Sequence, residues 1–183
     1  ATSPTQQTSI RLSRTDLRAR WQQMLRDPML ADIPGKIELT EKGTIELSPP
    51  TTRHSILQAF ITGALQRERP DGTTLTECAV ETEIGVRLPD VAWESSEFMS
   101  RYGTMSPLPR APELCIEVLS PSNSEPEMQQ KTAAYLAVGA LEVWLVRADG
   151  TVKMLNDRGR VAASAFGITL DGLPRFAPDS EIR

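Results

Sequence analysis

The 183-residue chain has little of what builds a structural metal site or a disulfide framework. It contains two cysteines, Cys78 and Cys115, and a single histidine, and it has no CxxC motif. A structural zinc site is therefore not expected. Both cysteines lie in apolar, strand-like runs, which favours buried free thiols over a disulfide and indicates a cytoplasmic protein. No run of about 18 apolar residues is present, so we expect no membrane partner.

Several catalytic motifs are also missing. There is no Gly-rich phosphate loop and no G-x-S-x-G elbow, so we interpret Ser120 and Ser122 as turn formers rather than nucleophiles. The net charge of −4 argues against general coating of nucleic acid, which depends on Lys and Arg, but it leaves a local basic groove open. The expected first helix is basic. We interpret its arginines as a solvated face, with DNA contact as the alternative.

The first half of the chain has the periodicity of helices and short strands. With 39% hydrophobic residues, the chain can form a single domain over residues 1–183, of which 1–10 are expected to fray. The patterns predict a helix from about Ser13 to Arg26, hairpin strands at Lys36–Leu39 and Thr44–Ser48, and a helix over Thr52–Arg69. Further strands are expected at Thr74–Val80, Glu83–Arg87 and Val91–Trp93. They are followed by a loop with weak helical character over Ser95–Arg110, which two prolines and Gly103 keep irregular.

The second half begins with an apolar strand, Leu114–Leu119, and a helix. Ser124 and Glu127 form a capping-box pattern at the start of this helix, and Gly139 is expected to close it. Strands at Leu141–Val146, Thr151–Leu155 and Ile168–Leu170 complete the predicted order. The whole pattern predicts an α/β protein of the α+β type, with helices packed on a mixed sheet.

Two charged residues stand where apolar residues are expected. Glu117 lies in the middle of the apolar strand, and Lys131 shares a helix face with Met128 and Tyr135. Buried charges are costly unless they are paired or bind a metal. A structural ion pair between Glu117 and Lys131 is one interpretation, and a functional site is the other.

Asp90 supplies a second carboxylate at the start of a strand. If the strands of Asp90 and Glu117 are neighbours, both side chains can converge on one Mg²⁺, which needs only one or two carboxylates beside waters and substrate phosphates. Lys131 can reach the same pocket, where it would orient a water or stabilise charge on a phosphate.

These residues belong to motifs that resemble the Uma-type restriction endonuclease family, part of the PD-(D/E)XK nuclease superfamily. The matching segments span about Lys36 to Leu155. They are Glu46-Leu47-Ser48-Pro49-Pro50 with His54, Pro89-Asp90-Val91-Ala92, Pro112-Glu113-Leu114 with Ile116-Glu117-Val118-Leu119-Ser120-Pro121-Ser122, Lys131 with Tyr135 and Gly139, and Glu142-Val143-Trp144-Leu145-Val146. The Asp171-Gly172-Leu173 tail is also similar.

The resemblance implies a restriction-endonuclease-like αβββαβ core, here with an N-terminal helix and hairpin and a C-terminal hairpin extension. It also implies Mg²⁺-dependent, or Mn²⁺-dependent, cleavage of DNA, with Asp90 and Glu117 as metal ligands. The superfamily's in-strand lysine is replaced by Leu119, and Lys131 is its expected substitute. Because many such nucleases act as dimers, a homodimer is expected, with the Leu141–Leu155 hairpin as a candidate interface.

Three further residues are supporting candidates, each with a plainer alternative. Glu46 is a possible extra ligand, but it alternates with apolar neighbours and can simply face solvent. His54 can line the site or cap a helix, and Tyr135 can line the site or sit in the core with its hydroxyl satisfied by a neighbour. The alternative function is a nuclease-fold protein without catalysis, acting as a nucleic-acid-binding or interaction module.

Overall fold

A computed structural model describes residues 10–177, so the expected fraying of residues 1–10 falls almost wholly outside the described part. Five helices are described, and they are α1 (Arg14–Met24), α2 (Pro28–Ala31), α3 (Thr52–Glu68), α4 (Ser96–Tyr102) and α5 (Glu125–Ala137). The strands are β1 (Lys36–Thr40), β2 (Ile45–Ser48), β3 (Gly72–Thr76), β4 (Val80–Thr82), β5 (Gly85–Arg87), β6 (Val91–Ser95), β7 (Leu114–Val118), β8 (Glu142–Val146), β9 (Val152–Asn156) and β10 (Gly159–Val161).

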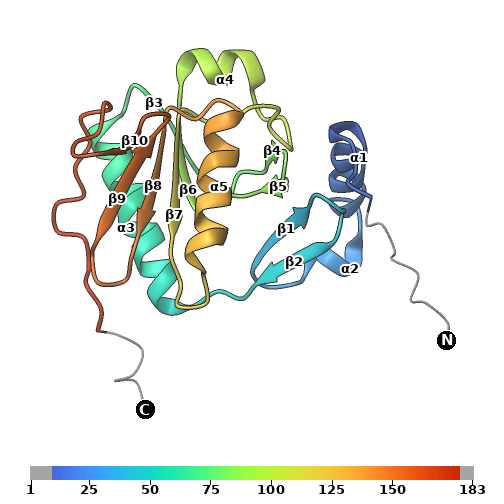
Figure 1. The fold of residues 1–183 in the computed structure, drawn as a ribbon, viewed down its shortest axis with the longest axis horizontal. Coiled ribbons are helices and arrows are strands. Elements are labelled where there is room, and N and C mark those ends of the chain that lie inside the picture. The colour runs from blue at the N-terminus through green and yellow to red at the C-terminus, as the bar shows by residue number, and fades with distance from the viewer. Residues whose placement is uncertain (1–9, 178–183) are drawn as a thin grey trace, which may run out of the picture.

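The strands form two sheets that lie beside each other (Figure 1). The larger sheet has the order β10-β9-β8-β7-β6-β3, in which only β7 and β8 run parallel. The smaller sheet has the order β2-β1-β5-β4 and is antiparallel. The elements α3, β3, β6, β7, α5 and β8 make the predicted αβββαβ core, and the predicted mixed α/β fold is confirmed.

Helices cover both faces of the larger sheet. Leu57, Ile61 and Leu65 of α3 pack on one face, against a cluster that includes Trp93, Ile116 and Trp144. Met128 and Tyr135 of α5 pack on the other face, in a cluster with Cys115 and Leu145. Strand β7 is buried along its whole length, as its apolar sequence predicts. Its charged residue Glu117 is therefore enclosed by α5.

The smaller sheet has a hydrophobic core of its own. Leu17, Trp21 and Met24 of α1 pack against Leu39 of β1 and Val86 of β5. The helix begins with Ser13, whose hydroxyl accepts the Asp16 N–H. This layer places β1 so that its first residues lie next to β6 and β7.

Local signals at the α5 termini gave the right boundaries. Ser124 and Glu127 form the predicted capping box, each side chain accepting the other residue's backbone N–H. At the other end Gly139 has φ +118°, and its N–H donates to the carbonyl of Leu136 at 3.2 Å. These caps fix the helix start beside the end of β7, which orients Lys131.

Some predicted strands were wrong. The expected strand Thr74–Val80 breaks at Glu77, which has φ +50°, and the chain then crosses to the smaller sheet as β4. The expected strand Glu83–Arg87 is shortened to β5 because residues 83–84 form the turn from β4. The expected strand Ile168–Leu170 is irregular. Ile168 is buried, but the Thr169 N–H donates to the Glu68 side chain instead of to the backbone of a neighbouring strand.

Other differences concern short elements and sheet edges. The weak helical character expected within residues 95–110 corresponds to a seven-residue helix, α4, which Ser95 caps. Strand β10 pairs with β9, so the hairpin of β8 and β9 does not offer the free edges expected of it.

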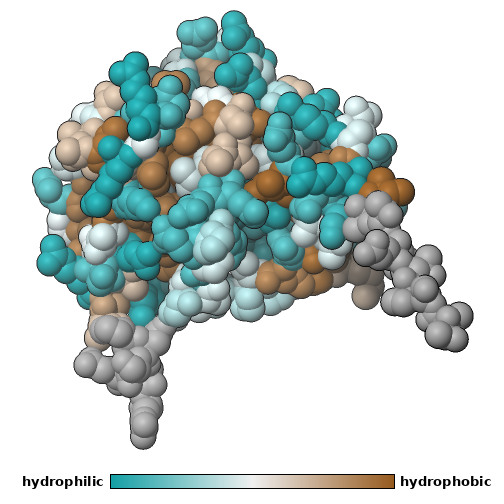
Figure 2. All heavy atoms as spheres, in the orientation of Figure 1, coloured by the Kyte–Doolittle hydropathy of each residue, from teal (hydrophilic) through white to brown (hydrophobic). Residues whose placement is uncertain are grey.

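No helix in the described part of the chain is long and apolar enough to cross a membrane. The face drawn in Figure 2 is mostly hydrophilic around α4 at the top.

Candidate active site

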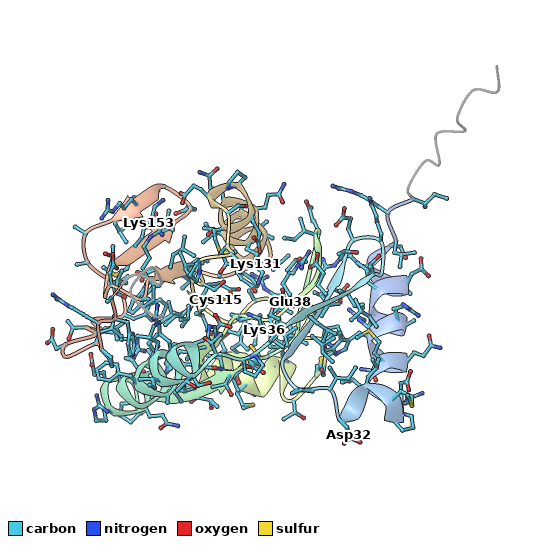
Figure 3. All side chains as sticks on the ribbon, turned by 90° about the horizontal axis from the view of Figure 1, so that it is seen from below. Asp32, Lys36, Glu38, Cys115, Lys131 and Lys153 are labelled. Carbon is cyan, nitrogen blue, oxygen red and sulfur yellow. The ribbon has the colours of Figure 1, made fainter. Side chains whose placement is uncertain are left out.

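A pocket of about 490 Å³ opens where the two sheets meet. It is lined by the start of β1, by the segment from β2 into α3, and by the segment from β7 into α5. Seen from below, the labelled Lys36, Glu38 and Lys131 gather at the centre of the molecule, whereas Lys153 and Asp32 lie at its periphery (Figure 3). The charged residues that the sequence scatters over about 100 positions are thus brought to one place.

Asp90 and Glu117 lie on the same face of the larger sheet. Strands β6 and β7 are antiparallel with Val91 opposite Ile116, and continuing that register by one residue sets Asp90 beside Glu117. Both residues line the pocket although their exposed fractions are only 1% and 4%. Asp90 is held in place through Oδ2, which accepts the Val118 N–H at 2.7 Å.

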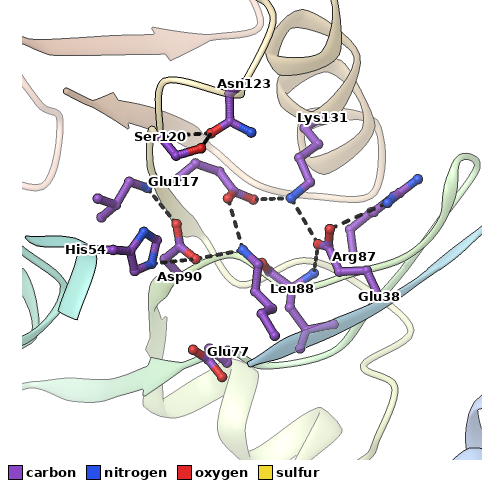
Figure 4. Close-up of polar contacts among 12 residues, drawn as sticks. Glu38, His54, Glu77, Arg87, Leu88, Asp90, Glu117, Ser120, Asn123 and Lys131 are labelled. Carbon is purple, nitrogen blue, oxygen red and sulfur yellow. Dashed lines mark hydrogen bonds and ion pairs between the residues drawn. The ribbon is translucent and has the colours of Figure 1, made fainter. Parts of the chain in front are cut away.

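Lys36 of β1 stands between the two carboxylates. Figure 4 shows the labelled Asp90 and Glu117 next to each other, with Lys131 nearby. Its Nζ lies 2.6 Å from Asp90 Oδ1 and 3.4 Å from Glu117 Oε2, and it donates to the carbonyl of Leu88 at 2.9 Å. The convergence of two carboxylates on one cation-sized position is the geometry expected of a metal site. In this structure an ammonium group is the cation at that position.

Lys131 approaches Glu117 from the other side. Its Nζ lies 3.2 Å from Glu117 Oε1 and 2.9 Å from Glu38 Oε1, so it bridges β7 and β1. The Tyr135 hydroxyl, one helical turn further along α5, donates to the same Glu117 oxygen at 2.8 Å. The hydroxyl of this core tyrosine is satisfied by a neighbour, as expected, and that neighbour is Glu117.

His54 contacts the site at the start of α3. Its Nε2 lies 3.3 Å from Asp90 Oδ1, and its backbone N–H donates to the Thr51 hydroxyl that caps the helix. Gln58, one turn later, donates to the backbone carbonyl of Asp90 at 3.0 Å. The first turns of α3 therefore hold the Asp90 segment while also lining the pocket.

The ionisation of these groups reflects burial set against charge pairing. Burial disfavours the charged forms of Asp90 and Lys36. For Asp90 the hydrogen bond from His54 and the charge of Lys36 outweigh burial, and for Lys36 the charges of Glu117 and Asp90 do so. The pKa of Asp90 lies well below its ordinary value, and the pKa of Lys36 lies above its own. For Glu117 burial dominates over both lysines, so its pKa is raised. A further cation beside Glu117 would favour its ionised form.

Glu38 extends the charged cluster into the smaller sheet. Its Oε1 accepts the Leu88 N–H at 2.7 Å, and its Oε2 lies 3.5 Å from an Arg87 guanidinium nitrogen. Burial raises its pKa, but Lys131 and Lys36 overcome that effect and the net pKa is lowered. Glu38 therefore serves as an ionised second partner for Lys131.

Glu46 lies apart from the two carboxylates. It pairs with Arg87, its side chain is 50% exposed, and it lines a neighbouring pocket instead of the one that holds Asp90 and Glu117. Its strand β2 is one of the two edge strands of the smaller sheet. The position fits the alternative interpretation, a side chain facing solvent, better than a role as ligand to an ion held by Asp90 and Glu117.

Lys36 and Glu38 are the site residues that the sequence did not single out. They lie two positions apart on β1, so they share one face of that strand, and their alternation with Ile37 and Leu39 is typical of a solvent-facing hairpin. Their same-face spacing was the available signal. It acquires meaning only once β1 is known to lie against β6 and β7.

Two other groups of polar residues have structural roles. Ser120 and Ser122 lie in the turn between β7 and α5, with their hydroxyls 2.7 Å apart. In the basic helix α1, Arg14 and Arg18 pair with the buried Glu81 of β4. These two arginines anchor α1 to the smaller sheet.

The residues present fit a divalent ion only in part. Asp90 Oδ1, Glu117 Oε2 and the Leu88 carbonyl are hard oxygen donors around one position, which suits Mg²⁺. Within residues 10–177 no group of three or more His, Cys, Asp or Glu side chains is arranged to hold a metal. An ion bound here would therefore complete its shell with waters and substrate oxygens.

Comparisons with known proteins agree with this fold. Residues 21–154 match the model of the Uma2 family, described as putative restriction endonucleases. The fold is also similar to a crystal structure of a putative nuclease of the DUF820 family from Anabaena variabilis. That comparison has a TM-score of 0.57 and 18% sequence identity, and it covers 74% of this chain and 87% of the other. A search of curated proteins gave no match.

Proposed function

This chain belongs to the Uma2 family, and from that membership together with the pocket geometry we propose that it is a Mg²⁺-dependent endonuclease that hydrolyses DNA phosphodiester bonds. The observation that carries the proposal is the convergence of Asp90 and Glu117 on one cation position in an open pocket. Mn²⁺ has the same preference for oxygen ligands and is expected to substitute.

In this proposal Asp90 and Glu117 would hold the metal, through the carboxylate oxygens that now contact Lys36. A bound Mg²⁺ would polarise the phosphodiester and acidify a coordinated water. The remaining oxygens of the two ligands are already engaged: Asp90 Oδ2 accepts the Val118 N–H, and Glu117 Oε1 accepts the Tyr135 hydroxyl. These hydrogen bonds orient the two carboxylates before any ion arrives, which lowers the cost of assembling the site.

Lys131 and His54 have roles beside the ligands. The Lys131 ammonium is fixed between Glu38 and Glu117, where it can offset negative charge that develops on a phosphate. His54 lies against Asp90 at the pocket wall, where it can hold or exchange a proton with a water. Lys131 is thereby the proposed substitute for the lysine that Leu119 replaces.

The charge of the pocket also favours cation uptake before substrate binding. Its lining includes five carboxylates, from Glu38, Glu77, Asp90, Glu117 and Glu127, against two ammonium groups, from Lys36 and Lys131. A polyanion such as DNA is repelled by a surplus of carboxylates. A divalent ion reduces that surplus, so we expect substrate affinity, as well as cleavage, to require metal.

One observation favours a second function. The two lysines already pair with Asp90, Glu117 and Glu38 in a network of ion pairs. A protein that kept the nuclease fold without catalysis, as a nucleic-acid-binding or interaction module, can be stabilised by such a network alone. This alternative predicts no metal-dependent cleavage and no metal-dependent change in melting temperature.

Plasmid nicking tests the two functions directly. Supercoiled DNA is incubated with wild-type protein and Glu117→Ala, each with Mg²⁺, with Mn²⁺ and with EDTA. Nicking by the wild type that needs metal and is lost in Glu117→Ala supports the proposal. Equal traces of nicking in both proteins indicate a contaminant, and no cleavage with either metal supports the alternative.

Two parallel arms sharpen the result. Single-stranded DNA and RNA of matched length, incubated under the same conditions, distinguish a DNA substrate from RNA, since the proposal requires faster cleavage of DNA. Lys153→Met is the matched control variant, because Lys153 forms an exposed ion pair with Glu125 and does not line the pocket. Its cleavage rate should equal that of the wild type.

A further inference from the structure

Lys36 occupies a position whose ligands suit a metal ion. The three oxygens around its Nζ come from Leu88, Asp90 and Glu117, and all three contacts are 3.4 Å or shorter. They are one backbone carbonyl and two carboxylates, the hard donors that Mg²⁺ and Mn²⁺ prefer. The side chain is only 11% exposed, so this ammonium is a built part of the pocket and not a surface group.

The Lys36 ammonium offsets the repulsion between the Asp90 and Glu117 carboxylates. Asp90 and Glu117 both approach a single point from adjacent strands, and two buried carboxylates this close repel each other unless a cation lies between them. The contacts of Lys131 do not meet this need, because it pairs with Glu117 and Glu38 on the far side and forms no ion pair with Asp90. Among the described lysines, Lys36 is the one that bridges both proposed ligands.

We infer that Lys36 is a built-in counter-ion that holds Asp90 and Glu117 together in the metal-free protein, and that a divalent ion binds between them only by displacing the Lys36 ammonium. The inference rests on the proposed function, since it concerns the same two ligands. Two cations cannot share one gap, because their repulsion at this distance is large in a partly buried site. Metal loading is therefore an exchange of one cation for another.

The exchange has a specific consequence for affinity. In the wild type, part of the binding free energy of the ion is used to break the contacts of Lys36. In a variant without this ammonium the ion has no competitor and should bind more tightly. The metal-free form of the same variant lacks the charge that holds the two carboxylates together. Removal of Lys131 does not have the same effect on the ion's position, because Lys131 occupies the opposite side of Glu117.

The test is a titration with Mn²⁺, followed by the electron paramagnetic resonance signal of free Mn²⁺ and by calorimetry. It compares wild type, Lys36→Met, Lys131→Met and Lys153→Met without substrate. Methionine keeps an unbranched side chain of similar size and removes the ammonium, that is, its charge together with its hydrogen-bond donors. We expect Lys36→Met to bind Mn²⁺ about tenfold more tightly than wild type. The gain in Lys131→Met should be clearly smaller, and Lys153→Met should be unchanged.

Each other result has a definite meaning. If Lys36→Met binds Mn²⁺ no more tightly than wild type, displacement is wrong, although metal-dependent cleavage by wild type can still hold. Equal gains in Lys36→Met and Lys131→Met also overturn the inference, because general electrostatics would explain both. If none of the four folded proteins binds Mn²⁺, the proposed metal-dependent function fails as well.

Melting experiments keep the inference testable if Lys36→Met is unstable. Without metal its melting temperature should be lower than that of wild type, and Mn²⁺ should raise it by more degrees than it raises the wild type. If the variant does not fold without metal, refolding in Mn²⁺ should recover it, whereas NaCl at equal ionic strength should not. Failure of Mn²⁺ to recover the fold would overturn the proposed exchange.

Discussion

Glu117 and Glu142 lie on neighbouring strands of the same sheet, and both are almost fully buried, with exposed fractions of 4% and 2%. Glu142 accepts hydrogen bonds from the Trp144 indole N–H at 2.8 Å, the Ser164 hydroxyl at 2.9 Å and the Ala165 N–H at 2.6 Å. Glu117 instead contacts two ammonium groups and one hydroxyl, and it lines an open pocket.

The difference separates a structural carboxylate from a candidate catalytic one. The partners of Glu142 are neutral donors from its own strand and from the segment after β10, so this carboxylate fastens that segment to the sheet. Two of the partners of Glu117 carry charge, and one of them, Lys36, occupies the position that we propose for a metal ion. Burial of a charge is common to both residues, but only Glu117 combines it with exchangeable cations and access from solvent.

The largest expected effect is on cleavage by Glu117→Gln. This change removes one of the two ligand charges, and a catalytic metal contributes several kcal/mol to transition-state stabilisation. Cleavage in the presence of Mg²⁺ should fall by about 10³-fold or more. The matched variant Glu142→Gln should cleave at the wild-type rate per folded molecule. A similar loss of cleavage in both variants would contradict the distinction between a structural Glu142 and a catalytic Glu117.

The second effect concerns stability, where we expect the change at Glu142 to cost more than the change at Glu117. Glu142→Ala leaves three donors without an acceptor and should lower the free energy of unfolding by about 3 kcal/mol. In Glu117→Gln each ammonium retains a carboxylate, Asp90 for Lys36 and Glu38 for Lys131, so the loss should stay below the roughly 3–5 kcal/mol of a broken buried pair. Urea denaturation without metal measures both, and a larger loss in Glu117→Gln would indicate a structural ion pair.

A third buried carboxylate, Glu94 of β6, extends the comparison because neither of its oxygens has a hydrogen-bond partner. Burial, with a smaller contribution from Glu113, raises its pKa from 4.5 to about 7. The folded state therefore keeps a proton between pH 4.5 and 7 that the unfolded state releases, so stability falls as pH rises through this range.

Glu94→Gln should remove that decline. We expect the variant to exceed the wild type by about 2 kcal/mol in unfolding free energy at pH 8 and to match it at pH 4, below both pKa values. Denaturation at the two pH values measures the difference. Glu97→Gln is the control, because Glu97 is exposed on α4 and its replacement should change stability little at either pH. A pH-independent difference for Glu94→Gln would refute the assigned ionisation.

The smallest effect is expected at Glu46. Its half-exposed pair with Arg87 contributes below about 1 kcal/mol, as surface ion pairs do. Glu46→Gln should leave Mn²⁺ affinity within about twofold of wild type. A larger loss of affinity in the Mn²⁺ titration would restore Glu46 as a ligand.

The sequence predicted those parts of the site in which charge interrupts an apolar pattern. Glu117 stands inside a buried strand, Lys131 on the apolar face of α5, and Asp90 directly before a strand. Each conflict is local, so it is visible without the fold. The structure brings these three residues to one pocket, and their catalytic roles stay predictions.

Lys36 and Glu38 show why the rest could not be predicted. Their strand has an ordinary alternation of charged and apolar residues, and their burial arises from contacts with Leu88, Asp90 and Lys131, which are about 50 or more positions away. The division into two sheets could not be predicted either. The chain leaves the larger sheet at Glu77, which has a positive φ, and glutamate is not a residue type from which that conformation is expected.

The hydrogen bond from the Val118 N–H to Asp90 Oδ2 bears on how this protein's descendants would diverge. That bond satisfies a buried backbone group at the end of β7, so natural selection for folding alone would retain Asp90, or an asparagine that can accept the same bond. The presence of Asp90 in a related protein is therefore not evidence that the protein is catalytically active. The identity of residue 36 is more informative, since a counter-ion is needed there only while both carboxylates are kept.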